Sequence, residues 1–156
     1  MVACHKTETQ STASNVDSTK IIDSINKART LINNEVKNKN YFDLLTGTYQ
    51  LSHSMISGTG KVTFEKVKNN HDEYDVEGEV YSGKNYFKIK GTAIRVSKEY
   101  FNFSGTTEQS IQSNDHGKVD RQNLNKSFKT KDQGKTWKMQ GMINSSGFVD
   151  DIYIKK

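Results

Sequence analysis

Hydrophobic and polar residues alternate through the middle of the chain. Three alternating runs, 73–81, 85–96 and 99–106, are separated by two or three polar residues. Side chains of a strand point to alternate faces of a sheet, so this pattern predicts an antiparallel meander. Similar runs predict further strands at 46–52, 58–67, 118–129, 136–144 and 148–154. We therefore expect about eight antiparallel strands within residues 45–155.

The first two runs also predict their own pairing. A two-residue turn at Gly83-Lys84 places Val80 opposite Phe87 and Glu79 opposite Lys88. Opposite charges then meet on one face and apolar side chains on the other, whereas a slip of one residue would turn carboxylates toward the core. The acidic row of residues 73–79 is therefore expected to be a solvent-facing strand paired with lysines. A cation site is the alternative, but a straight strand cannot wrap an ion.

Aromatic residues gather in the following run. We expect Phe101 and Phe103 to lie opposite Ala93 and Gly91, so that large rings cover small residues in the core. The alternative is a platform for stacking nucleic-acid bases, formed by these two rings together with Tyr86, Phe87 and Tyr100.

A helical period precedes the strands. Apolar residues recur at three- and four-residue spacing, which predicts an amphipathic helix over about 19–37. Asp17 or Ser18 can cap its start. We expect this helix to pack on the sheet or to close the mouth of a barrel; display to a partner or to a membrane surface is the alternative. The apolar positions are Ile21, Ile22, Ile25, Ala28, Leu31, Ile32 and Val36.

Composition narrows the fold class. The chain is 32% hydrophobic and 26% charged, which fits a β protein with one solvated face, and it contains no proline. We expect a leader at 1–17 and a single domain at 18–156. The predicted fold is mainly β: an antiparallel meander of about eight strands closed into an up-and-down barrel, with one N-terminal helix. This arrangement is similar to that of lipocalins; an open sheet or a sandwich is the alternative.

The only cysteine of the chain, Cys4, follows Val2 and Ala3. This run resembles the end of the lipobox of bacterial lipoproteins, in which the cysteine becomes the lipidated first residue of the mature protein. The resemblance implies a lipid anchor at Cys4 after removal of a signal peptide. It also implies a location in the bacterial cell envelope, facing the periplasm or the cell surface. Residues 5–17, rich in Thr, Ser, Gln and Asn, would then form the tether.

Residues 130–137 read Thr-Lys-Asp-Gln-Gly-Lys-Thr-Trp. They resemble the Asp-box of sialidase-type propellers, a hairpin turn in which the Asp accepts backbone N–H groups and the Trp packs beneath. A single copy in 156 residues cannot build a propeller, so the resemblance implies a structural turn and no glycosidase activity. The residues that carry it are Thr130, Asp132, Gly134, Thr136 and Trp137.

Positive charge is concentrated in one part of the chain. The net charge is +5, and residues 118–138 contain seven bases against two acids. This region is expected to be a solvated face, with binding of an anionic partner as the alternative.

The sequence contains no recognisable catalytic pattern. Its four histidines lack the spacing of a zinc site, and no serine lies in a nucleophile elbow. The adjacent Asp150 and Asp151 would point to opposite faces of a strand, which is poor geometry for acid–base catalysis. We therefore expect no enzymatic activity, no cofactor and no metal site.

The expected function is that of a non-catalytic envelope lipoprotein that binds a small apolar ligand or an envelope protein. The alternative is an inhibitor or immunity protein that blocks an exported enzyme or toxin. Nucleic acid is not an expected partner of a protein anchored in the envelope, and the sequence does not indicate an oligomeric state. The candidate residues for ligand or partner binding are His53, Met55, Tyr86, Tyr100, Asp115 and His116.

Overall fold

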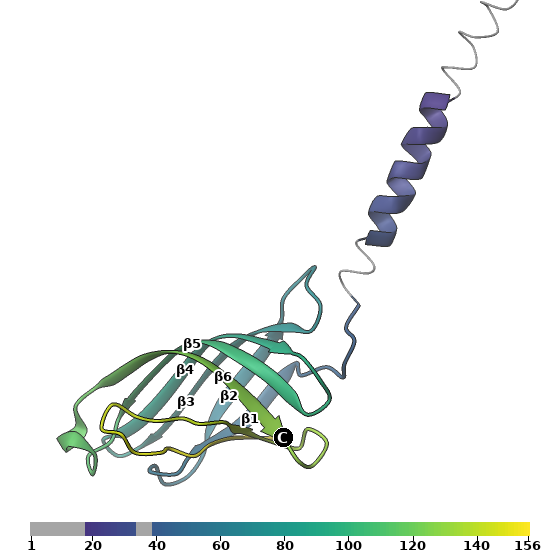
Figure 1. Ribbon diagram of the computed structural model, residues 1–156. Helices are drawn as coiled ribbons and strands as arrows, with labels where there is room; N and C mark the ends of the chain where they lie inside the picture. The colour runs from purple at the N-terminus through teal and green to yellow at the C-terminus, as the bar shows by residue number, and fades with distance from the viewer. Residues whose placement is uncertain (1–17, 34–38) are drawn as a thin grey trace, which may run out of the picture. The chain divides into compact units, whose positions relative to one another are not determined.

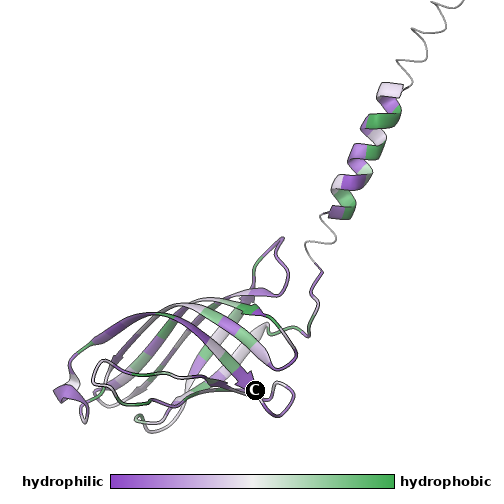
Figure 2. Ribbon diagram, viewed as in Figure 1, coloured by the Kyte–Doolittle hydropathy of each residue, from purple (hydrophilic) through white to green (hydrophobic). Residues whose placement is uncertain are grey.

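The computed structural model describes residues 18–33 and 39–156. Cys4 and the leader lie outside the described residues. The chain divides into two units, residues 1–39 and 40–156. The first unit contains the predicted helix, which spans 18–33; residues 34–37 of the prediction, including Val36, are not among those described. Apolar and polar bands alternate along this helix (Figure 2), and no helix of the described part has the length and apolar content needed to cross a membrane.

The second unit is a closed barrel of eight antiparallel strands, each paired with its neighbours in the sequence (Figure 1). The predicted fold class, a mainly β up-and-down barrel with one helix near the N-terminus, is thereby confirmed. The strands are β1 (Gly47–His53), β2 (Gly60–Lys66), β3 (Glu73–Ser82), β4 (Asn85–Arg95), β5 (Tyr100–Ser110), β6 (Asp120–Thr130), β7 (Thr136–Met139) and β8 (Ile152–Lys155).

The predicted register of β3 and β4 is confirmed. Val80 pairs with Phe87 and Glu79 with Lys88. Glu77 lies opposite Lys90, with 3.8 Å between the carboxylate and the ammonium group. The acidic row is therefore a solvent-facing strand with lysine neighbours, as expected from the two-residue turn.

The predicted register of β4 and β5 is wrong by two residues. Ala93 pairs with Phe103, and Gly91 faces Gly105. The turn is longer than predicted, because the N–H groups of Val96 and Ser97 both donate to the carbonyl of Tyr100. The ring of Phe103 still covers small residues: a Cβ on Gly91 or on Gly105 would lie within 3 Å of it.

The last hairpin is shorter than predicted. β7 ends at Met139 and β8 begins at Ile152, with one bridge between Ile143 and Val149 in the segment that joins them. Gly141 has a φ of +62°, a left-handed conformation. It interrupts the alternation of side chains, so that the residues after it point to the opposite face from the one predicted. Met142 and Asn144 are therefore buried, and Phe148, which was expected in the closing strand, is exposed.

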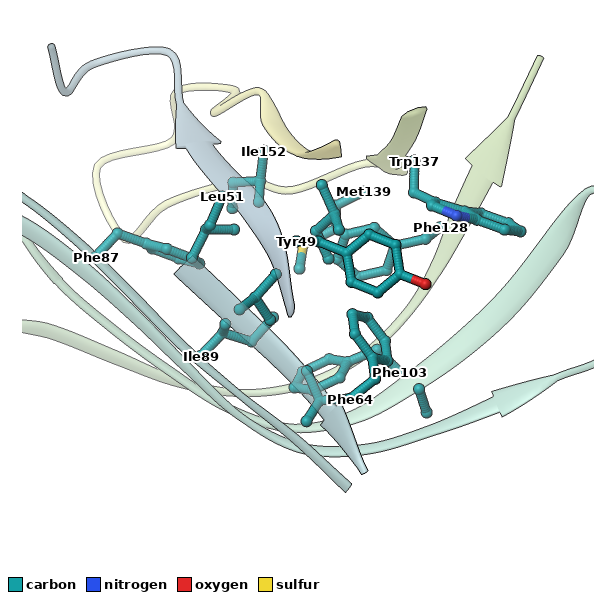
Figure 3. Packing of buried hydrophobic residues seen from close by; sticks show 14 of the residues in the cluster. Tyr49, Leu51, Phe64, Phe87, Ile89, Phe103, Phe128, Trp137, Met139 and Ile152 are labelled. Carbon is teal, nitrogen blue, oxygen red and sulfur yellow. The ribbon is translucent and has the colours of Figure 1, made fainter. Parts of the chain in front are cut away.

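Aromatic and aliphatic side chains together fill the barrel interior (Figure 3). Phe101 stacks on Phe128 with 4.7 Å between ring centroids and lies 4.9 Å from Trp137. Phe64 contacts Phe101 edge-on at 5.7 Å. These contacts bring β2, β5, β6 and β7 together, and their buried apolar area supplies the main free-energy gain of folding.

The segment before β1 is fastened to the barrel by two buried charged residues. The guanidinium of Arg95 donates to the carbonyl of Asp43 at 2.6 Å and lies 5.9 Å from the ring of Phe42 and 5.4 Å from that of Trp137. The carboxylate of Asp72 accepts the N–H of Phe42 at 3.1 Å. The segment 40–45 is thus held against the strand ends beside the start of β1.

Candidate binding surface

Four connections lie at the same end of the barrel because the strands run up and down in order: 54–59, 83–84, 111–119 and 140–151. We call this the long-loop end. Met55, Asp115 and His116 are exposed there, on two of these loops. His53, Tyr86 and Tyr100, the other three candidates, lie in strands, and only the first of them is buried.

His53 belongs to a buried polar network below the long-loop end. Its Nδ1 accepts the N–H of Met55 at 3.1 Å, so the proton lies on Nε2, which is 3.1 Å from the side-chain oxygen of Gln109. The amide nitrogen of Gln109 donates to Asp150 at 2.9 Å, and that of Asn144 donates to Asp150 at 3.2 Å. His53, Gln109, Asn144 and Asp150 are each no more than 5% exposed.

The network has the geometry of a structural brace. Burial by itself raises the pKa of Asp150, but the polar groups of His53, Gln109 and Asn144 outweigh it and hold that pKa below its ordinary value. Both ring nitrogens of His53 already have partners within the protein, so neither is directed at a ligand. The brace joins β1, β5 and the loop 140–151. No group of three or more potential metal ligands occurs among the described residues.

The long-loop end exposes apolar side chains above this network. Beside them is a polar recess of about 270 Å³, which Asp115 and Ser145 help to line. Asp115 and His116, in the short 3-10 turn η1 (Asp115–Gly117), have φ values of 50° and 53°, which are uncommon for residues with a side chain. The exposed apolar residues of these loops are Met55, Val119, Ile143, Phe148 and Val149.

Tyr86 is part of a charged cluster on the outer face. Its hydroxyl donates to Glu108 at 2.8 Å, and Arg121 donates to the same carboxylate at 2.6 Å. The hydrogen bond to Glu108 raises the pKa of Tyr86, while the bonds from Tyr86 and Arg121 lower the pKa of Glu108. The hydroxyl group of Tyr86 is therefore held by Glu108 on the neighbouring strand β5.

A basic hollow of about 670 Å³ lies on the outer face where β6, β7, β8 and β1 meet. We call it the lysine groove. Four lysines and one acid contribute to it, together with a tyrosine and three neutral polar residues. The lining residues are Ser52, Lys129, Lys131, Asp132, Thr136, Lys138, Gln140, Tyr153 and Lys155.

One row of paired residues crosses this groove. Tyr100 pairs with Lys129, Lys129 with Lys138, Lys138 with Tyr153, and Tyr153 with Ser52. Two lysines are thus directly opposed on neighbouring strands, an arrangement that destabilises a sheet.

Both central lysines of the row have aromatic and polar partners. The Nζ of Lys129 lies 5.3 Å from the ring of Tyr100, and the Nζ of Lys138 lies 5.5 Å from that of Tyr153. Hydrogen bonding to Tyr100 raises the pKa of Lys129, and the 2.9 Å ion pair with Asp151 raises that of Lys138. Both ammonium groups are therefore charged at neutral pH.

The turn at 130–137 forms the rim of the groove. The carboxylate of Asp132 accepts the N–H of Thr136 at 2.8 Å and the hydroxyl of Thr130 at 2.8 Å, and the former bond is the main cause of its lowered pKa. Gly134 has a φ of +88°, and a Cβ at this position would lie 3.6 Å from the buried ring of Trp137. These contacts therefore fix the conformation of the turn, whose residues Lys131, Asp132 and Thr136 line the groove.

Comparison with known protein families gives a match over most of the chain. The model of the PM1083 family matches residues 26–155, which include the entire barrel. The chain belongs to the PM1083 family. No curated protein and no solved structure matches it.

In this PM1083 family member, barrel closure assembles the lysine groove from distant parts of the sequence. Lys129, Lys131 and Lys138 come from the basic region that the sequence analysis identified. Tyr153, Lys155 and Ser52 were missed. Pairing of β8 with β7 brings Tyr153 and Lys155 beside the basic region, and only the pairing of β8 with β1 adds Ser52. The groove can hold an anion between ammonium groups and offers neutral hydrogen-bonding groups around it.

Proposed function

We propose that the protein is a non-catalytic binding module of the bacterial cell envelope that engages a negatively charged partner through the lysine groove. The observation that carries this proposal is the direct opposition of Lys129 and Lys138 within a hollow. Like charges in this position cost stability. The ion pair of Lys138 with Asp151 offsets part of this repulsion. An anion placed between the two lysines offsets more of it, so the arrangement favours a bound anionic group over a bare surface.

The barrel interior supports binding at the surface. Phe64, Phe101, Phe128 and Trp137 occupy the space that a small apolar ligand would need. The likeness to lipocalins is accordingly proposed for the strand arrangement alone. The contacts of Asp132 and Gly134 support the likeness of the turn at 130–137 to an Asp-box in a structural role.

The envelope location rests on the lipobox-like run Val2-Ala3-Cys4. We expect cells that produce the protein from its complete gene to attach a lipid to Cys4. In cells fed an alkyne analogue of palmitate, the Cys4→Ser variant should lose the label and leave the membrane fraction. A variant with serine in place of Thr7, in the same polar segment, serves as the control and should keep both. Equal labelling of the two variants would rule out the anchor.

Site-specific photo-crosslinking in those cells tests the groove. With a benzoylphenylalanine at position 140, inside the groove, we expect crosslinked species of higher mass. The same label at Asn123, an exposed position on the outer face of β6, should give none. The yield at 140 should fall in washed cells at about 1 M salt, where the Debye length shrinks to about 3 Å. Equal yields at 140 and 123 would contradict binding through the groove.

The runner-up function is inhibition of an exported enzyme or toxin through the long-loop end. Its supporting observation is the exposed apolar set at that end, which includes Phe148 at 66% and Val149 at 67% exposure. Exposed apolar side chains on neighbouring loops are typical of protein-binding surfaces. A crosslinker at position 148 separates the two proposals. Discrete crosslinks from 148, with none from 140, would favour the inhibitor.

A further inference from the structure

The size and lining of the lysine groove indicate the chemical class of its partner. This inference rests on the proposed function. We propose that the groove binds an acidic polysaccharide, a sugar chain that carries carboxylate or sulfate groups. The part of the row that lines the groove, from Lys129 to Ser52, crosses four strands. At about 4.8 Å between neighbouring strands it extends for roughly 14 Å. That length suits an extended chain of several sugar residues better than a single small ion.

The lining of the groove matches such a chain. The lining combines lysines with neutral hydroxyl and amide groups, namely those of Ser52, Thr136 and Gln140. The ammonium groups pair with the acidic substituents, and the neutral groups suit the sugar hydroxyls. Lysine is a flexible point charge, so a row of lysines tolerates anionic groups whose positions vary along a polymer.

Nucleic acid fits this lining less well. Single strands are held by stacking of bases on open aromatic faces. Here the ammonium groups of Lys129 and Lys138 lie against the rings of Tyr100 and Tyr153, at 5.3 and 5.5 Å.

A membrane surface or a protein partner also fits less well. Binding to lipid headgroups by insertion needs apolar side chains that protrude, whereas this site is a hollow without an aliphatic side chain in its lining. The cores of protein interfaces are depleted of lysine. The lysine groove has four lysines in its lining.

Titration calorimetry with the purified full chain tests the inference. The probes are tetragalacturonate and a heparin tetrasaccharide, with neutral maltotetraose as the reference. We expect at least one acidic probe to bind, no heat from maltotetraose, and weaker binding as salt rises. The double variant K129Q/K138Q should weaken that binding about tenfold, as the loss of two exposed charge contacts predicts.

The matched control is K88Q/K90Q, which removes the same charge from the outer face of β4. It should leave the affinity within about twofold. Near-ultraviolet circular dichroism must show that both variants remain folded. Equal weakening by both variants, or equal binding of the neutral sugar, would overturn the inference.

Two further probes identify the competing partners. Binding of a single-stranded thymidine oligonucleotide or of phosphatidylglycerol vesicles, with neither acidic sugar bound, would overturn the polysaccharide assignment. So would the absence of all binding. If the crosslinks from position 140 persist in that case, the proposed function stands and only the partner class is wrong. If those crosslinks are absent as well, both fail.

Discussion

Replacing Phe128 with alanine should lower the free energy of unfolding by about 3–5 kcal/mol. Phe128 is fully buried and stacks on Phe101 at an interplanar angle of 13°, with the edge of Phe103 against it at 6.4 Å. These rings come from adjacent, fully hydrogen-bonded strands, so the wall of the barrel cannot collapse into the space that the ring leaves. Urea denaturation at neutral pH should show a lower midpoint with an unchanged slope.

Phe148→Ala provides the matched control. It makes the same chemical truncation at a side chain that is 66% exposed on the long-loop end. Its effect should stay within about 0.5 kcal/mol. If the two alanine variants lost similar stability, the packing of rings in the barrel interior would not be the main source of the effect.

The sequence predicted the strands best where alternation was strict and the turn was short. Between Glu73 and Arg95 the two-residue turn fixed the register, because a slip would have moved charges to the core. The longer turn before Tyr100 had no such constraint, and the register there was wrong by two residues while the faces remained right. The left-handed Gly141 could not be distinguished from a strand glycine by its pattern alone.

The candidate residues were harder to assign because their partners are distant in the sequence. Tyr49, Leu51 and His53 alternate and point inward, so the period of two could have shown that His53 is buried. Its partner Gln109 is 56 residues away, and no local pattern predicts that pair. The same limit applies to the lysine groove, because three of its nine lining residues come from β8 and β1.

Asp150→Asn should lower the free energy of unfolding by about 2–3 kcal/mol at pH 7. The carboxylate accepts hydrogen bonds from Gln109 at 2.9 Å and Asn144 at 3.2 Å in a site that is 2% exposed. An asparagine there keeps the shape but loses the charge that strengthens both bonds, and it turns an N–H group toward a donor. Urea denaturation of the wild type and the variant from pH 7 to pH 3 measures the effect.

The pH dependence of this difference distinguishes lost charge from lost packing. The pKa of Asp150 is lowered in the folded protein, so its contribution is fully present above the unfolded value of about 3.9 and is lost as the pH falls through the folded value. The difference in the free energy of unfolding between wild type and variant should therefore be constant above about pH 5 and shrink below about pH 4. The lowered pKa values of Glu108 and Asp132 affect both proteins equally and cancel.

Asp151→Asn serves as the control. It removes only a half-exposed ion pair with Lys138 and should lower the free energy of unfolding by less than about 1 kcal/mol. A gap for Asp150→Asn that stays constant down to pH 3 would mean that its cost is one of packing.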